Sequence, residues 1–208
     1  MFSIRYAIFF LMLLWSWAAG QQQVANTNDA GEGSLRQAIA NADNGGTITF
    51  ALGLSGGTII LTSGELNTIL NNLTIDASAL ASPITINANN NFRIFFHGGN
   101  GTFAINNLVV TQGRAAGVSG GGIFSSGNVT VTNSTISGNN ATLGGGIRGF
   151  MNLTLSGCAR VISNTAGTGK QWRLTGTVNG GDLANTREDN YQGPDCPASV
   201  GGVAEPLF

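Results

Sequence analysis

The chain has 208 residues, of which 9% are charged, and its formal net charge is −1. Ordinary globular proteins carry about 25% charged residues, yet 42% of this chain is hydrophobic, so its composition does not indicate disorder. Nine scattered Lys and Arg residues form no basic stripe, which argues against nucleic acid or an acidic membrane as a partner.

The first twenty residues have the pattern of a secretory signal peptide. Arg5 supplies a positive charge, an apolar run follows from Ala7 to Trp15, and small residues at 18–20 precede Gln21. This run is shorter than the roughly 20 residues that span a bilayer, and no later stretch approaches that length. We therefore expect residues 1–20 to be removed on export, leaving no transmembrane segment in the mature chain. The alternative is an uncleaved amino-terminal anchor.

A single convincing helix is predicted, within the segment 21–46. Ser34 can cap its amino terminus, and a pair of glycines follows its end. Arg36 and Gln37 are expected to face water. The end of a repetitive β fold exposes apolar core and unpaired backbone groups, so we interpret this segment as an amino-terminal cap. The cap contact is assigned to one apolar face of the helix: Leu35, Ala38 and Ile39.

The segment 47–166 consists of short apolar-alternating stretches separated by Gly, Asn and Ser, which is typical of short strands. The stretch 133–141 returns at 158–166, a shift of 25 residues. Other motifs recur with a shift of 24 residues: Gly120-Gly121-Gly122-Ile123 returns as Gly144-Gly145-Gly146-Ile147, and Asn128–Val131 returns as Asn152–Leu155.

A period of this length, without helical stripes, indicates a solenoid in which each repeat forms one coil. We predict an all-β fold, a right-handed parallel β-helix of about 22–25 residues per coil with a short capping α-helix. Threonines between the inward residues would give the outer wall a hydroxyl surface. The residues expected to point inward and stack are apolar: Val129, Val131, Ile136, Leu153, Leu155 and Ile162.

The last segment, 167–208, loses the period and gains charge and proline. We interpret it as an irregular tail, which is either a partial cap or disordered. Cys158 and Cys196 could form a disulfide in an oxidising compartment. Two separate thiols are the alternative, because nothing in the sequence determines the distance between them.

Candidate catalytic residues are scarce. Enzymes that cleave acidic polysaccharides on this fold need clustered carboxylates to hold Ca²⁺ or to act as acid and base. No Asp or Glu occurs between Ala77 and Gly181. Glu65 and Asp76 could form a pair only if the fold brought them together. We therefore predict no enzyme activity, no catalytic residue, no metal site and no cofactor.

Some other residues could contribute to a surface. His97 is the single histidine and has no Cys, His or carboxylate beside it in sequence, so we interpret it as structural. Arg93, Arg114 and Arg148 could line one outer face, although scattered solubilising charge explains them more simply. Binding of ice or a crystalline polymer is a third hypothesis, but the repeat threonines do not build a long regular array: Thr130, Thr132 and Thr154.

The segments 26–29, 33–39 and 46–50 resemble the amino-terminal cap of secreted bacterial β-helix repeat proteins of the CSLREA type. The two Gly-Gly-Gly-Ile motifs and the stretch 133–139 are similar to those proteins and to the repeats of polymorphic outer membrane proteins. The resemblance covers residues 24–166. This chain departs from the pattern in being short, without the additional coils, barrel or sorting tail of many members, and its anchoring stays open.

The resemblance implies export to the outer cell envelope or the medium, with adhesion or surface display as the usual function. We therefore expect a non-catalytic surface or structural module whose partners are surface glycans or other envelope proteins. The alternative is a carbohydrate-active enzyme of the pectate-lyase-like β-helix superfamily. The sequence specifies neither the ligand-binding residues nor the oligomeric state.

Overall fold

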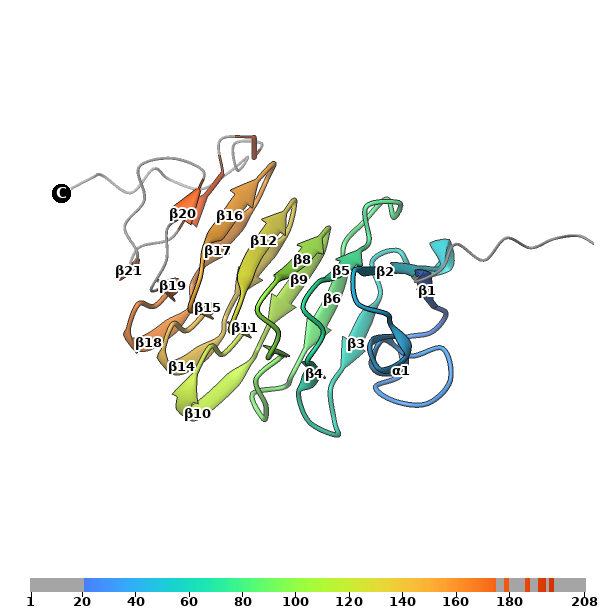
Figure 1. The fold of residues 1–208 in the computed structure, drawn as a ribbon, viewed down its shortest axis with the longest axis horizontal. Coiled ribbons are helices and arrows are strands. Elements are labelled where there is room, and N and C mark those ends of the chain that lie inside the picture. Colours follow the sequence, from blue (N-terminus) through green and yellow to red (C-terminus); the bar gives the residue numbers. More distant parts are fainter. Residues whose placement is uncertain (1–20, 175–177, 180–185, 188–190, 194, 197–208) are drawn as a thin grey trace, which may run out of the picture.

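The described chain is nearly all β and winds into a parallel solenoid of about six turns, which confirms the predicted fold class (Figure 1). The predicted leader, 1–20, and most of the segment after residue 179 lie outside the described residues. Within the described residues no helix is long and apolar enough to span a membrane. The computed structural model describes residues 21–174, 178–179, 186–187, 191–193 and 195–196.

The amino-terminal cap consists of strand β1 (Gln21–Val24) and helix α1 (Leu35–Asn41). The helix begins at Ser34, whose side chain accepts a hydrogen bond from the Gln37 backbone N–H at 3.1 Å. It packs beside β1 and β4 (Leu66–Thr68), at the first turn of the solenoid (Figure 1). Three apolar side chains of the helix are buried: Leu35, Ala38 and Ile39.

Arg36 was predicted to face water. It is instead only partly exposed, and it ties the cap to the first turn. Its guanidinium donates hydrogen bonds of 2.7 Å to the Asp29 carboxylate and to the carbonyls of residues 64–65. Asp29 also accepts hydrogen bonds from the backbone N–H groups of Thr62 and Ser63. Burial alone would raise the pKa of Asp29, but its hydrogen bonds, with those of Ser63 and Arg36 foremost, hold that pKa well below its usual range.

The strands form four sheets, and all pairings are parallel except those of β21 and β22. A short 3-10 helix, η1 (Leu52–Leu54), follows β2. Sheet A contains β1, β2 (Gly46–Phe50), β5 (Leu73–Asp76), β8 (Thr102–Asn106), β12 (Asn128–Thr132), β16 (Leu153–Ser156) and β20 (Val178–Asn179). Sheet B contains β3 (Thr58–Ile60), β6 (Ile84–Asn87), β9 (Leu108–Thr111), β13 (Thr135–Ser137), β17 (Arg160–Ile162) and β22 (Tyr191–Gln192).

The other two sheets lie on the remaining sides of the coils. Sheet C contains β4, β7 (Phe95–His97), β11 (Ile123–Ser125), β15 (Ile147–Gly149), β19 (Trp172–Leu174) and β21 (Thr186–Arg187). Sheet D is short and contains β10 (Arg114–Ser119), β14 (Asn140–Leu143) and β18 (Thr165–Thr168). Because sheet D begins only at β10, that strand is a sheet edge.

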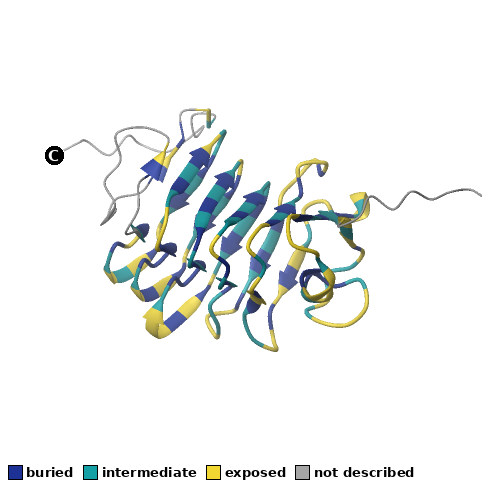
Figure 2. Ribbon diagram, in the orientation of Figure 1, coloured by how far each residue is buried: buried dark blue, intermediate teal, exposed yellow. Residues whose placement is uncertain are grey.

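Buried and partly exposed residues alternate along the strands, as expected for a sheet with one face on the core (Figure 2). Ile162 was predicted to point inward, but it aligns with the outer residue Ser137 and is only partly buried. Val161 takes the inward place because it is in register with Ile136. One core column in sheet A is formed by Ile48, Ile75, Ile105, Val131 and Leu155.

The turns are longer near the amino terminus than the predicted period. Along sheet A, residues in register are separated successively by 27, 30, 26, 24 and 25 positions. The 24-residue turn is the one in which the Gly-Gly-Gly-Ile motif recurs, with Ile123 paired to Ile147. Extra residues in the earlier turns lie in the bends, so the sequence period is visible only where the bends are equal in length.

Parallel pairing continues beyond residue 166, where the irregular tail was predicted to begin. β18, β19 and β20 pair with β14, β15 and β16. Trp172 is fully buried and follows Ile147 in the core column of sheet C. β21 and β22 then return in antiparallel orientation, and a disulfide joins Cys158 to Cys196. The final residues, 197–208, lie outside the described part of the chain.

Candidate functional site

A pocket of about 580 Å³ opens beside β10, where one bend of the solenoid becomes longer than the bend before it. Phe95 follows Ile86 by nine positions, whereas Ile123 follows Val110 by thirteen, although the residues of each turn are in register. The longer bend contains β10, and the preceding turn has no strand in the corresponding place. The change of bend length therefore leaves a ledge, and the pocket lies on it.

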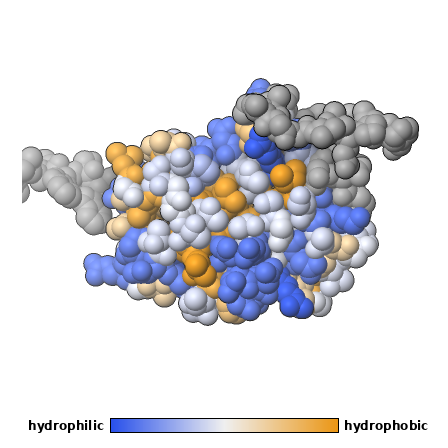
Figure 3. Space-filling view, turned by 180° about the vertical axis from the view of Figure 1, so that it is seen from behind, coloured by the Kyte–Doolittle hydropathy of each residue, from blue (hydrophilic) through white to orange (hydrophobic). Residues whose placement is uncertain are grey.

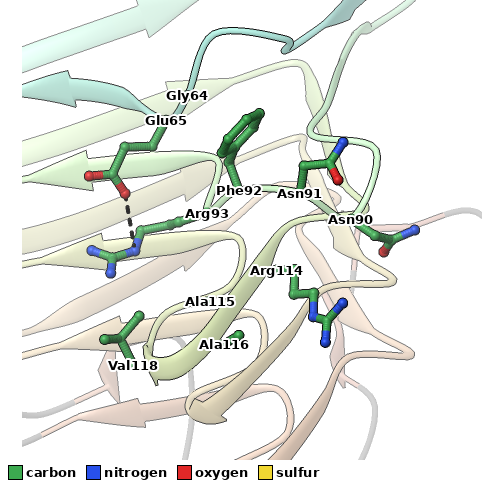
Figure 4. A pocket seen from close by; sticks show the side chains of 10 residues that line it. All are labelled: Gly64, Glu65, Asn90, Asn91, Phe92, Arg93, Arg114, Ala115, Ala116 and Val118. Carbon is green, nitrogen blue, oxygen red and sulfur yellow. Dashed lines mark ion pairs between the residues drawn. The ribbon is translucent and has the colours of Figure 1, made fainter.

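Polar and charged side chains reach the pocket from three separate stretches of sequence: the turn before β4, the bend before β7, and β10. In the view of Figure 4, the Glu65–Arg93 pair lies on one side and Arg114 on the other. Phe92 and Val118 add apolar surface to the same pocket. The polar and charged side chains are Glu65, Asn90, Asn91, Arg93 and Arg114.

The bend that carries the asparagines is fixed by its backbone. Asn89 and Asn90 adopt left-handed conformations, with φ of 50° and 58°, which asparagine tolerates better than most residues. The Asn90 N–H donates to the Gln112 carbonyl at 2.8 Å, and the Arg114 N–H donates to the Phe92 carbonyl at 2.7 Å. These bonds tie the bend to the next turn, so both walls of the pocket are held in place.

Arg93 is the most constrained side chain of the pocket. Its Nε lies 3.6 Å from the Glu65 carboxylate, and its side chain is 11% exposed. The guanidinium carbon lies 5.3 Å from the ring centroid of Phe96 and 5.0 Å from that of Phe124. Burial lowers the pKa of Arg93, and the charge of Glu65 acts in the opposite direction. The Arg93 guanidinium thus lies over two rings at the edge of the pocket.

Those rings belong to a column on the outer side of sheet C, which we call the aromatic–arginine column. The Phe96 and Phe124 rings are parallel, with centroids 5.2 Å apart, and Phe150 meets Phe124 edge-on at 5.6 Å. The Arg148 guanidinium carbon lies 4.4 Å from the Phe150 centroid. The residues in register along this column are Asn67, Phe96, Phe124, Arg148 and Arg173.

Three arginines that the sequence explained as scattered solubilising charge therefore lie on one side of the solenoid. Arg93 and Arg114 line one pocket, and Arg148 lies further along the aromatic–arginine column that includes Phe96 and Phe124. Arg148 donates hydrogen bonds to the carbonyls of Gly149 and Arg173, at 2.8 and 3.1 Å. Burial and the positive charge of Arg173 both lower the pKa of Arg148. Positive charge is therefore concentrated on this side.

Arg114 differs from the other arginines because it is exposed on an edge strand. Within the described residues its guanidinium has no hydrogen bond or ion pair. The Nη atoms of Arg93 likewise donate no hydrogen bond there. Donor groups of two cationic side chains are thus available around one cavity.

His97 is structural, as the sequence indicated. It is fully buried on β7, and its Nε2 donates to the carbonyls of Leu70 and Asn71 at 2.9 and 3.2 Å. Because a carbonyl can only accept, Nδ1 is left to accept from the Ser125 hydroxyl at 2.8 Å. Burial lowers the pKa of His97 more than these carbonyls raise it, so the ring is neutral at neutral pH.

Glu65 and Asp76 are not brought together. Asp76 lies on β5 in sheet A, where its carboxylate accepts from the Ser78 N–H at 2.9 Å. Glu65 lies on the side of sheet C and is paired with Arg93. Within the described part of the chain, no three His, Cys, Asp or Glu side chains gather where they could hold a metal ion.

The outer side of sheet A bears the hydroxyl surface that the sequence predicted. Its threonine column is longer than the repeat alone suggested, because earlier turns contribute to it as well. Ala104 interrupts it between two pairs of threonines. The threonines in register are Thr47, Thr74, Thr130 and Thr154.

Exposed apolar surface is dispersed. Seen from behind, it forms separate patches among neutral and hydrophilic residues (Figure 3). Two of the exposed apolar residues adjoin the candidate site: Val118, 51% exposed, lines the pocket, and Phe150, 46% exposed, ends the aromatic part of the column.

The pocket has no recognisable signature in the sequence. Asn90 and Asn91 do not stand out because asparagine is common in the bends of this chain, and Glu65 is no closer in sequence to an arginine of the pocket than to Asp76. The signal that could have found the site is the unequal spacing of the strands on either side of residue 114, which marks a change in bend length. Comparison with family models, curated proteins and solved structures found no match to this chain.

Proposed function

We propose that this chain is a non-catalytic β-helix module of the cell exterior that binds glycans, in a role of adhesion or surface display. The observation that carries the proposal is the pocket at the β10 ledge. It combines two arginines and two asparagines with apolar surface from Phe92 and Val118. Ligand pockets typically join such apolar surface to a few fixed polar groups, and a volume of about 580 Å³ lies within their usual range.

The relationship to secreted bacterial β-helix repeat proteins is part of this proposal. The cap segment 33–39 and the paired Gly-Gly-Gly-Ile motifs support membership of the CSLREA type or kinship with polymorphic outer membrane proteins. Such a relationship places the chain in the medium or at the outer cell envelope, and makes other envelope proteins the second class of partner.

Binding is favoured over catalysis by the number of carboxylates that line the pocket. Glu65 is the pocket's carboxylate, and it is paired with Arg93. Among the described residues no second carboxylate lines the pocket, whereas two-carboxylate glycoside cleavage requires one. A carbohydrate-active enzyme of the pectate-lyase-like superfamily remains the alternative function.

A combined binding and cleavage screen distinguishes these functions. The secreted chain would be applied to a glycan array and incubated with polysaccharides, each with and without Ca²⁺, and the length of the recovered polymers would be measured. We expect saturable binding to a subset of glycans and unchanged polymer length. Shortened polymer would contradict the proposal and return attention to Glu65. Absence of any glycan binding would equally overturn it.

Export can be tested separately. The full chain, expressed in a bacterial host with its own leader, is expected to reach the periplasm or medium with Gln21 as its first residue, because small residues precede that position. Intact mass and amino-terminal sequencing of the purified protein provide the measurement. A chain that keeps Met1 and stays with the membrane fraction would instead support an uncleaved anchor.

A further inference from the structure

We infer that the glycan is an anionic polysaccharide, which places one carboxylate or sulfate group at Arg93 and another at Arg114 and continues along the aromatic–arginine column toward Arg148. This inference rests on the proposed function, and it specifies the class of ligand and the residues that select it.

The balance of charge on this side of the solenoid supports an anionic ligand. Arg93, Arg114, Arg148 and Arg173 lie in the pocket or on the column, and Glu65 is the carboxylate that faces them. No Asp or Glu occurs between Ala77 and Gly181, so the turns from β6 to β20 add no negative side chain. Within the described residues the arginines of this side therefore outnumber its carboxylates, and a bound anion would supply countercharge.

Arg93 is prepared to bind an oxyanion. Its stacking on Phe96 and Phe124 and its contact with Glu65 fix the guanidinium plane before any ligand arrives. A planar guanidinium presents a fork of donors that matches a carboxylate or sulfate, and a fixed fork loses less entropy on binding. Glu65 occupies the Nε side, which leaves the Nη side for the ligand.

Arg114 supplies the second positive group from the opposite wall. It belongs to β10, whereas Arg93 belongs to the bend before β7, so a polymer that contacts both would bridge two turns. Its exposed guanidinium has no partner to give up within the described residues. Charge-assisted hydrogen bonds to an oxyanion are stronger than neutral ones, so Arg114 is expected to contribute much of the selectivity.

The remaining lining fits a sugar ring. Phe92 and Val118 present apolar surface for the C–H face of a ring, and the amides of Asn90 and Asn91 can donate to and accept from hydroxyl groups. A polymer that leaves the pocket past Arg93 meets the rings of Phe124 and Phe150. Arg148 is 8% exposed and lies against the Phe150 ring, so it adds positive charge there and not a free surface donor. The ladder of rings and arginines therefore suits a chain with repeated negative charges.

Three variants test the inference on the secreted chain. R114Q removes the unpartnered cation, E65Q removes the competing carboxylate, and R160Q makes the same charge change on sheet B, away from the pocket. Calorimetric titration would use a galacturonic acid oligosaccharide, its neutral methyl ester, a sulfated dextran oligosaccharide and single-stranded DNA. The two acidic sugars distinguish carboxylate from sulfate recognition, and thermal melting shows whether each variant is folded.

We expect R114Q to weaken binding of an acidic oligosaccharide about tenfold or more, as the loss of a charge-assisted contact predicts, with an unchanged melting temperature. E65Q should tighten binding about twofold or more, and R160Q should change it by less than about twofold. The methyl ester should bind much more weakly than the acid. Because E65Q leaves Arg93 without its carboxylate neighbour, binding of the acidic oligosaccharide by this variant should also be more sensitive to salt.

The outcomes separate the inference from the proposed function. If neutral and acidic sugars bind equally well and R114Q has no effect, the glycan-binding function survives and the anionic selectivity is wrong. If R160Q weakens binding as much as R114Q does, the pocket is not the site. If only single-stranded DNA binds, both proposals are overturned.

Discussion

Replacing Phe103 by alanine is expected to lower the free energy of unfolding by about 3–5 kcal/mol. Phe103 is 1% exposed and lies between Leu73 and Val129 in a core column of sheet A. Its ring centroid is 5.3 Å from that of Phe95 and 5.5 Å from the His97 ring. Hydrogen-bonded turns on both sides prevent the walls from closing, so truncation leaves a cavity.

Phe124 provides a matched control, because the same change is made on the outer side of sheet C. Its ring rests on Phe96 and under Arg93 but is partly exposed, so Phe124→Ala should cost only about 1 kcal/mol. Urea unfolding of both variants beside the unchanged protein provides the comparison. Equal losses, or a larger loss for Phe124→Ala, would show that the assignment of inner and outer faces is wrong.

A second large effect is expected for Asn139→Ala, at about 3 kcal/mol or more. Asn139 is 1% exposed at the bend between sheets B and D. Its Nδ2 donates to the Val110 carbonyl and to the Asn164 Oδ1, both at 3.0 Å, and its Oδ1 accepts from the Gly113 N–H at 2.8 Å. Removing the amide leaves several buried polar groups unpaired, and each costs about 1–3 kcal/mol.

The adjacent residue provides the control for this change. Asn140 is exposed and its Nδ2 bonds only to the Thr165 hydroxyl at 2.6 Å, so Asn140→Ala should change stability by less than about 1 kcal/mol. Thermal and chemical unfolding of the pair would be compared. A similar small loss of stability for both variants would mean that the buried amides of Asn139 and Asn164 do not hold adjacent turns together.

The fold class could be predicted because two signals depend only on local chemistry. The alternation of inner apolar and outer polar residues identifies short strands, and the recurrence of Gly120–Ile123 at Gly144–Ile147 identifies stacked turns of equal length. The helix at 35–41 was visible from its capping serine and apolar face. Each of these features involves residues close in sequence or identical motifs.

Other parts of the fold depend on contacts that no local pattern contains. Arg36 donates hydrogen bonds to the carbonyls of residues 64–65 because the cap folds back on the first turn, which the helix pattern does not indicate. Trp172 takes the place that Ile147 has in the preceding turn, so the repeat continues after its sequence signature has ended. The inward place of Val161, by contrast, follows from the shift that relates 133–141 to 158–166, which aligns Val161 and not Ile162 with Ile136.

The candidate site was hidden for the same reason. Arg93 and Arg114 are separated by one turn and line the same pocket only because the bend containing β10 is longer than its predecessor. Glu65 reaches Arg93 from yet another turn. Composition made this charge look scattered, whereas the register of sheets B and C concentrates it at one ledge.

Amide hydrogen exchange, with and without a saturating acidic oligosaccharide, tests most directly whether the ledge is the binding site. The account predicts slower exchange in residues 89–93 and 114–118, which form the pocket walls, and unchanged exchange in β12 on sheet A. Protection confined to sheet A or sheet B, or no protection at saturating ligand, would contradict it.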